Sequence, residues 1–450
     1  MKTEEAKIEL FENKSIPKAI MELSIPTVIG CLVMVLYNLA DTYFVGRLND
    51  PIETAAVTLV APIILAFNAV NNLFGTGTSS VISRALGSRD YEKAKKTSAF
   101  GFYMAIFSGL LFSVAVVIFK APLLNLLGAD SSTYDATCDY LFWTVILGAV
   151  PAILNVVIGF MIRAEGLALH ATIGTMSGCL LNILLDPVFI LPFGLNMGAA
   201  GAGLATFISN MVACLYFIIL IIVKRGKIIM TIAFSMFKPD RATVIDIFSV
   251  GIPAAIQNLL NVTGMAIINK LAAGYSTEAV DAMGITHKLA MVPMYISMGM
   301  AQGVMPLVGY NFASKNRKRM RDATVFTAKI AGGFMIIAAL VMIIFSEPIV
   351  RAFMDNDSIV IHGSGFLRGF ALAQPFLGVD FLAVGIFQAC GYGKRTFIFA
   401  VLRKLVLEIP ALIILDIIFP LTGLAYAQFV AEFVLAIVAF ILLVKLMKEE

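Results

Sequence analysis

The chain alternates between long apolar runs and short polar segments. An α-helix that crosses the hydrocarbon core of a membrane needs about 20 consecutive, mainly apolar residues. By this measure the pattern predicts twelve membrane-spanning helices, over residues 20–46, 54–84, 98–123, 138–162, 171–192, 198–223, 246–273, 279–312, 323–350, 364–389, 397–419 and 421–444. Several runs exceed the required length, so we expect tilt, extension beyond the bilayer, or kinks at Pro26, Pro253 and Pro306.

The composition strengthens this interpretation. Of the 450 residues, 60% are hydrophobic and 14% are charged, whereas roughly a quarter of the residues in an ordinary soluble protein are charged. A mean hydropathy of +0.92 over the whole chain is too high for a single membrane anchor. A soluble enzyme, a disordered chain and a disulfide scaffold are therefore excluded, and the expected fold class is an all-α polytopic membrane protein.

Lys and Arg predict the orientation of the helices, because these residues concentrate in cytoplasmic loops. Basic residues gather before the first run, after the second, sixth, eighth and tenth runs, and at the C-terminus. The opposite loops hold little beyond Arg47, Lys120 and Arg351. Both termini are therefore predicted to be cytoplasmic. The net charge of +4 is a modest excess spread over short loops, so we expect membrane lipid and no nucleic acid as a partner.

The segment before the first run contains several charged residues and continues into a full span, so we expect no cleaved signal peptide. Within it, Ile8, Phe11 and Ile16 are spaced to line one side of a short helix. We expect this helix to lie on the membrane surface.

The two halves of the sequence repeat at a spacing of about 226 residues, at which Gly77, Ser88 and Arg89 recur as Gly303, Ser314 and Lys315. Each half contains an even number of spans, so both enter the membrane from the same side and form parallel six-helix repeats. We predict an N-terminal lobe of residues 1–223, a cytoplasmic linker of residues 224–245 and a C-terminal lobe of residues 246–450. Two such lobes would enclose a cleft.

Two aspartates in the first half stand out, because a charged side chain near the centre of a bilayer costs about 3 kcal/mol on insertion scales. Asp41 and Asp186 both fall five or six residues before the predicted outer end of a span, Asn182 lies one turn before Asp186, and Thr206 returns to similar depth. Four oxygen-bearing side chains can thus converge to bind a hard cation such as Na⁺, or a proton shared by the carboxylates. Alternatively, Asp186 marks a helix irregularity before Pro187, and Asp41 pairs with a neighbouring Tyr or Asn.

The second half contains further polar residues within its spans. Asp380, Glu408 and Glu432 lie near mid-span, and the residues that join the first two in a possible second polar site are Gln257, Asn258, Asn261 and His287. His287 is a possible titrating group. The alternative is internal pairing of the acids with Lys270, His287 or Lys288.

Residues 279–312 are rich in methionine, including Met291, Met294 and Met298. Together with aromatic residues such as Phe376, flexible thioethers suit a pocket for flat, lipophilic cations, although methionines at helical spacing also serve as ordinary core. Catalytic motifs and a nucleotide-binding loop are absent from the sequence. We therefore expect a transporter driven by an ion gradient, with no enzymatic activity and no cofactor beyond the coupling ion.

Five segments resemble motifs of the multidrug and toxic compound extrusion (MATE) family, and they are YNLADTYFVG (37–46), SRALGSRDYEKAK (83–95), NILLDP (182–187), GAAGAGLAT (198–206) and PLVGYNFASKN (306–316). The likeness covers nearly the whole chain and is strongest to the DinF-like and MepA-like bacterial branches. It implies a V-shaped, two-lobed antiporter in the bacterial cytoplasmic membrane that exports organic cations using an inward Na⁺ or H⁺ gradient. We expect the transporter to be a monomer. The residues that match the cation site of the family's amino-terminal lobe are Asp41, Asn182, Asp186 and Thr206.

One departure concerns the second lobe, because another branch of the family uses an acid in the seventh span, where this sequence has Gln257 and Asn258. The alternative function is a lipid-linked oligosaccharide flippase of the same superfamily, whose cleft would be rich in Arg or Lys. The spans carry few basic residues, chiefly Lys270 and Lys288, which disfavours this alternative. A major-facilitator transporter shares the six-plus-six arrangement, but the loop after the second span lacks the glycine-rich basic signature of that family.

Overall fold

The computed structural model describes residues 8–48, 50–238, 240–354 and 356–448, and this part of the chain is almost entirely helical. The first half comprises α2 (Ile16–Gly46), α3 (Pro51–Gly87), α4 (Tyr91–Leu127), α5 (Tyr134–Leu141), α6 (Ala149–Ala164), α7 (Ala168–Ile190) and α8 (Gly198–Val223). The second half comprises α9 (Arg241–Ala273), α10 (Thr277–Ala313), α11 (Arg317–Ile344), α12 (Ser346–Arg351), α13 (Asp357–Ala389), α14 (Gly393–Val401), α15 (Ile409–Ile418) and α16 (Thr422–Lys448). Short π-helical and 3₁₀ turns complete the set, namely η1 (Glu9–Asn13), η2 (Phe142–Leu147), η3 (Phe234–Met236) and η4 (Leu402–Glu408).

The helices follow the predicted spans, with breaks that the hydropathy pattern did not reveal. By length and composition, ten of the described helices can cross a membrane, or up to eleven if the bent pair of Tyr134–Leu147 and Ala149–Ala164 counts as one span. That pair is bent by 47°. The predicted span 397–419 corresponds to α14, η4 and α15, and its middle contains Arg403, Lys404 and Glu408. Because the helix is divided into these three short pieces, no one of them is long enough to cross a membrane, and the segment is not among the ten.

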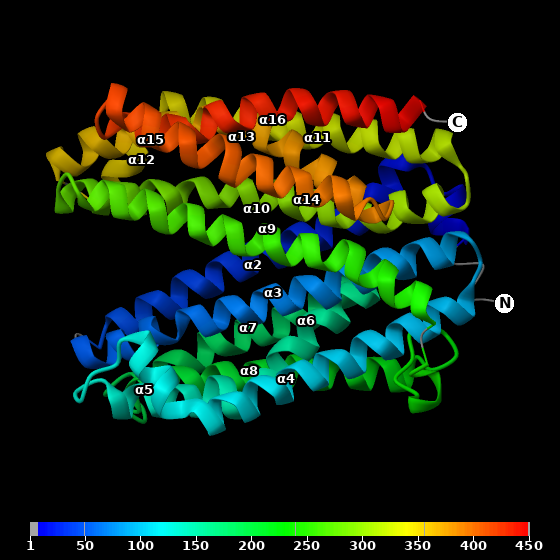
Figure 1. Ribbon diagram of the computed structural model, residues 1–450, viewed down its shortest axis with the longest axis horizontal. Coiled ribbons are helices and arrows are strands. Elements are labelled where there is room, and N and C mark those ends of the chain that lie inside the picture. The colour runs from blue at the N-terminus through cyan, green and yellow to red at the C-terminus, as the bar shows by residue number, and fades with distance from the viewer. Residues whose placement is uncertain (1–7, 49, 239, 355, 449–450) are drawn as a thin grey trace.

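The two halves form two layers of long helices that diverge from one end of the molecule (Figure 1). Both ends of the described chain lie at that end, which we call the terminal end. The halves meet chiefly where α3 packs on α9 and α2 packs on α10. A large hydrophobic cluster unites residues of both halves, while a second one belongs to the C-terminal half alone.

Two glycines allow the helices of opposite halves to approach closely. A Cβ atom added at Gly77 in α3 would lie 2.5 Å from the backbone oxygen of Ile247 in α9. A Cβ atom added at Gly303 in α10 would lie 2.5 Å from Cα of Ser24 in α2. Because Gly77 and Gly303 are equivalent in the sequence repeat, each half contributes a glycine at the same position of the repeat to the close contact with the other half.

The N-terminal segment forms a short helical turn as predicted, and its apolar side chains pack against protein. Residues Glu9–Asn13 form the π-helical turn η1, and both Leu10 and Phe11 are buried. Gly166, with φ of +86°, leaves the space that Leu10 and Phe11 fill, since a Cβ there would lie 2.8 Å from Leu10 Cδ2. A protein pocket that fits an aromatic ring completely removes more apolar surface from water than a membrane interface does.

The segment between the halves packs on the first half. It runs from the end of α8 at Val223 to Asp240, the N-cap of α9. The carboxylate of Glu165 accepts hydrogen bonds from the backbone of Ile229, at 3.0 Å, and of Met230. At its other end, the Thr243 hydroxyl donates to Asp240 and lowers the pKa of that carboxyl. These contacts attach the linker to the end of α6 and cap the start of α9.

Candidate functional site

The structure brings together the four polar residues of the first half that the sequence singled out. Asp41 comes from α2, Asn182 and Asp186 come from α7, and Thr206 comes from α8. Asn182 and Asp186 are buried. With the amide of Asn182 turned to satisfy both neighbours, its Nδ2 donates to Asp186 Oδ2 at 3.0 Å and its Oδ1 accepts from the backbone N–H of Thr206 at 3.1 Å. Asn182 thus links Asp186 to α8.

Asp41 completes this cluster from the neighbouring helix. It lies close enough to Asp186 for the two carboxylates to repel each other when both are ionised. Within the described residues, neither Asp41 nor Asp186 forms an ion pair with Lys, Arg or His. A buried carboxylate without a counter-charge is unfavourable. The arrangement therefore favours uptake of a proton or a cation.

Two tyrosines extend the cluster; the sequence suggested a neighbouring Tyr beside Asp41 only as an alternative to an ion site, and gave no indication of Tyr140. Tyr37 lies one turn before Asp41 in α2, where it interacts with Asp41 and with the Thr206 side chain. Tyr140 of α5 is buried and lies near both carboxylates. The spacing of four residues between Tyr37 and Asp41 places them on one helix face and is a usable sequence signal. Tyr140 has no such signal, because only the packing of α5 against α8 brings it to the cluster.

The donor atoms in this cluster are mixed. Across the described ranges, no group of three or more His, Cys, Asp or Glu side chains is arranged to hold a metal ion. A coupling Na⁺ would therefore need the amide, hydroxyl and backbone oxygens around the two carboxylates, which are ligands that suit a hard cation.

The acids of the second half form ion pairs with different basic residues from those expected. Arg403 of η4 donates through Nε to Glu432 Oε1 at 2.6 Å, and its Nη1 lies 3.5 Å from Asp380 Oδ2. Lys404 Nζ lies 2.6 Å from Glu408 Oε1. All five side chains are buried. The acids thus pair with Arg403 and Lys404 and not with Lys270 or Lys288, which the sequence suggested. Arg403 and Lys404 lie in the middle of a predicted span, where the hydropathy pattern did not draw attention to them.

His287 lies beside this network without joining its ion pairs. Its ring centroid is 5.8 Å from that of Phe370, and it is near enough to Lys404 and Glu408 to sense their charges. The predicted second polar site is therefore divided: Asp380 and Glu408 belong to the charged network and His287 lies beside it, whereas the three amides of α9 lie elsewhere.

Those amides line a cavity of about 110 Å³ between the two halves. Gln257, Asn258 and Asn261 face it together with Met298, and Asn72, Thr76 and Phe160 contribute from the first half. Met291, Met294 and Phe376 are not among its lining residues. Phe376 instead packs with Phe429 and Phe433, with ring centroids 5.8 and 5.2 Å apart. One of the four residues proposed for a substrate pocket thus lies at this central cavity.

Comparison with known proteins gives a consistent result. The family model MatE matches residues 26–188 and again residues 253–414, once in each half. The multidrug export protein MepA of Staphylococcus aureus (strain MRSA252) is 33% identical over 433 residues, which cover 96% of this chain and 94% of MepA. MepA of Staphylococcus haemolyticus (strain JCSC1435) is 35% identical over 430 residues, which cover 95% of this chain and 93% of that protein.

Solved structures agree over the same extent. An outward-facing conformation of a multidrug resistance MATE family transporter of the MOP superfamily has a TM-score of 0.90 and 26% identity, covering 98% of this chain and 99% of that chain. A MOP superfamily transporter from Pyrococcus furiosus, for which reverse polarity of the binding pocket suggests a different function, has a TM-score of 0.89 and 26% identity, covering 98% of this chain and 99% of that chain.

Proposed function

The chain belongs to the MATE family, and from that membership we propose that it is a cation-coupled antiporter that exports lipophilic organic cations. It is an integral membrane transporter of the multidrug export class and not an enzyme. We assign Asp41, Asn182, Asp186 and Thr206 to the site of the coupling ion, which is H⁺ or Na⁺.

The observation that carries this proposal is a pair of nearby carboxylates from α2 and α7 that no described basic residue neutralises. A transported cation or proton can occupy such a site and leave it again, whereas a permanent ion pair would fill it. The Asn182 bridge to Asp186 and Thr206 ties the same carboxylate to a third helix. Charge at the site can therefore influence how α2, α7 and α8 pack.

We propose that the terminal end faces the cytoplasm of a bacterial cell and that each half of the chain acts as one lobe. The halves pack together at that end through α3, α9, α2 and α10, which corresponds to a transporter closed towards the cytoplasm. Drug and coupling ion must then favour different states, because a ligand with equal affinity for both shifts nothing. Both halves of one chain line the central cavity, which supports a working monomer.

The flippase alternative requires free positive charge to hold a pyrophosphate. The two basic residues in the middle of the second lobe, Arg403 and Lys404, are both engaged by carboxylates. Pairing of this kind leaves little positive potential for an anionic substrate. The antiporter is therefore the better-supported function.

The test is efflux of a cationic dye such as ethidium from proteoliposomes, with Na⁺ and pH gradients imposed separately. We expect one of the gradients to drive transport in the parent, and Asp41→Asn and Asp186→Asn to abolish that dependence. Asp357→Asn is the matched control, since its side chain is 86% exposed and pairs only at the surface with Arg351. Unchanged coupling in both site variants, at equal protein content, would refute the site assignment. Failure of both gradients to drive the parent would refute secondary antiport.

A further inference from the structure

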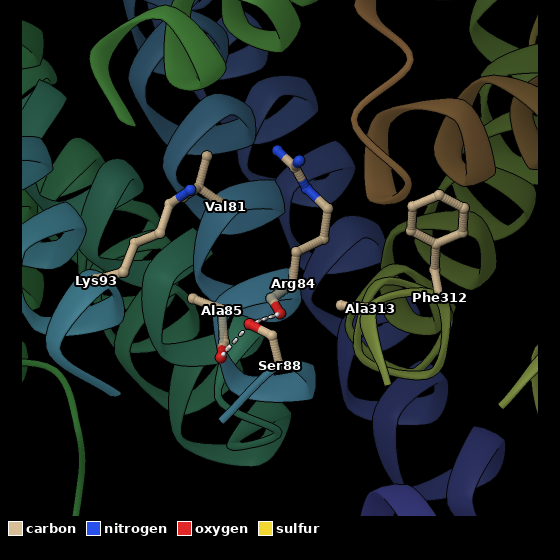
Figure 2. Close-up of a pocket in the computed structure, with 7 residues that line it drawn as sticks. All are labelled: Val81, Arg84, Ala85, Ser88, Lys93, Phe312 and Ala313. Atoms are coloured by element: carbon tan, nitrogen blue, oxygen red, sulfur yellow. Dashed lines mark hydrogen bonds between the residues drawn. The ribbon is translucent and has the colours of Figure 1, made fainter. Parts of the chain in front are cut away.

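A second cavity, of about 230 Å³, lies at the terminal end where α3, α4 and α10 meet. It is lined by basic side chains of the first half and an aromatic side chain of the second. Figure 2 shows Arg84 in the middle of this cavity, with Lys93 on one side and Phe312 on the other. We call it the basic pocket, and it is separate from both the aspartate cluster and the central cavity.

The basic pocket has more positive than negative charge. Lys93 Nζ lies 3.2 Å from Asp246 Oδ2, and Arg84 Nη1 lies 3.9 Å from the same oxygen. One carboxylate thus faces two cations and leaves a net positive charge. Among the described residues, Arg84 Nη2 is a buried donor with no acceptor. A buried donor left unpaired costs about 1–3 kcal/mol, and more if it is charged, so the pocket favours an additional acceptor.

A third cation, Arg317 of α11, lies next to the aromatic side chain of this pocket without itself lining the cavity. The guanidinium of Arg317 lies over the ring of Phe312, with its Cζ 4.5 Å from the ring centroid. Its Nη1 is also a buried donor for which the described part of the chain offers no acceptor. Two guanidinium groups with unused donors therefore lie near the same aromatic side chain, one lining the pocket with it and one over its ring. Guanidinium groups are particularly suited to phosphate, because their planar array of donors matches its oxygens.

The position of the pocket identifies the source of such a phosphate. Arg84 lies one turn before α3 ends at Gly87, and Lys93 lies in the first turn of α4. These are the depths at which a spanning helix passes the lipid head groups. Apolar side chains, including Val81, Phe312 and Ala313, line the rest of the pocket and suit the glycerol and first carbons of a lipid.

We propose that the basic pocket binds the phosphate of an acidic phospholipid, such as phosphatidylglycerol, from the leaflet at the terminal end. The bound head group would contact Arg84 and Lys93 of the first half and Phe312 of the second, with the charge of Arg317 next to that ring. It therefore binds best when the halves are closed at this end. A ligand that binds one state better than the other shifts the population towards that state, so acidic lipid stabilises the closed terminal end.

The experiment is native mass spectrometry of the purified full chain, incubated with equal amounts of phosphatidylglycerol and phosphatidylethanolamine. Both head groups offer a phosphate to the guanidinium groups, but phosphatidylethanolamine also carries an ammonium group that the net positive charge of the pocket repels. We therefore expect retained phosphatidylglycerol to exceed phosphatidylethanolamine about tenfold. The double variant Arg84→Gln with Arg317→Gln should lose this preference. Lys318→Gln is the matched control, because it removes an exposed charge from the neighbouring position of α11.

A competition arm distinguishes the two sources of phosphate. Glycerol 3-phosphate at millimolar concentration should fail to displace the retained lipid. Displacement by it would show that soluble phosphate suffices and would overturn the lipid assignment. Equal retention of both lipids would refute selective binding of acidic phospholipid. An undiminished preference in the double variant would refute the assignment of that binding to the basic pocket. If the double variant does not fold, Lys93→Gln carries the same test, since this side chain is partly exposed and its removal leaves the guanidinium groups in place.

Discussion

Phe11 stacks on Tyr310, with ring centroids 4.8 Å apart and ring planes inclined by 15°. The contact joins the segment before α2 to the end of α10. It is reinforced by Arg319, whose Nε donates to the backbone oxygen of Phe11 at 2.6 Å. Because Gly166 of the first half forms the other side of the Phe11 pocket, the N-terminal segment is held by both halves at the terminal end.

Phe11→Ala should therefore destabilise the state that is closed at the terminal end. Truncation of a buried aromatic ring costs about 3–5 kcal/mol, so we expect a lower thermal unfolding midpoint in detergent. Phe353→Ala is the control, because that ring is 64% exposed. Equal midpoints for the two variants would show that the N-terminal segment contributes nothing to the closed state.

Arg403→Met should destabilise the second half strongly. It leaves Asp380 and Glu432 buried without their shared cation, and removal of one member of a buried ion pair costs about 3–5 kcal/mol. Combining this substitution with Asp380→Asn and Glu432→Gln removes the uncompensated charge, so unfolding midpoints should recover in the triple variant. A triple variant that is stable but has lost ion-coupled dye efflux would place coupling in the second half, contrary to our site assignment.

Tyr37→Phe should weaken the coupling-ion site without altering the fold. The substitution removes only the hydroxyl that interacts with Thr206 beside Asp41. Loss of one such hydrogen bond is worth about 0.5–1.5 kcal/mol, so the ion concentration for half-maximal dye efflux should change by about two- to tenfold. Tyr43→Phe in the same helix is the control, since Tyr43 is 58% exposed. An identical ion dependence in both variants would exclude Tyr37 from the site.

Gly303→Ala should disfavour closure at the terminal end. The added methyl group would meet Ser24 of α2 at 2.5 Å. In Gly332→Ala, the control in α11, nothing lies within 4 Å of the added atom, and Ala is favoured over Gly in a helix by about 1 kcal/mol. Thiol labelling of a cysteine introduced in place of Ser24 should therefore be faster with Gly303→Ala than with Gly332→Ala. Equal labelling rates would contradict the close packing of α2 and α10.

The fold was largely predictable because lipid imposes simple rules on sequence. Apolar length gave the positions of the helices, and the repeat that relates Gly77 to Gly303 proved to describe equivalent contacts between the halves. The proximity of Asp41 and Asp186 was also predictable, because both lie at the same depth in the membrane along their predicted spans. Arg403 and Lys404 escaped notice, because their neighbours in sequence are apolar and their partners come from other helices or the next turn. The docking of Phe11 depends on a pocket formed by residues distant in sequence, which no local pattern reveals.

The contacts of Gly77 with Ile247 and of Gly303 with Ser24 bring the backbones of facing helices close together at the junction between the halves. A glycine contributes no side-chain rotamers to such a contact, so separating the helices at these two positions releases no side-chain conformational entropy from the glycines themselves. The free energy that holds the halves together must therefore come from their neighbours, among them the buried hydrophobic cluster that both halves share.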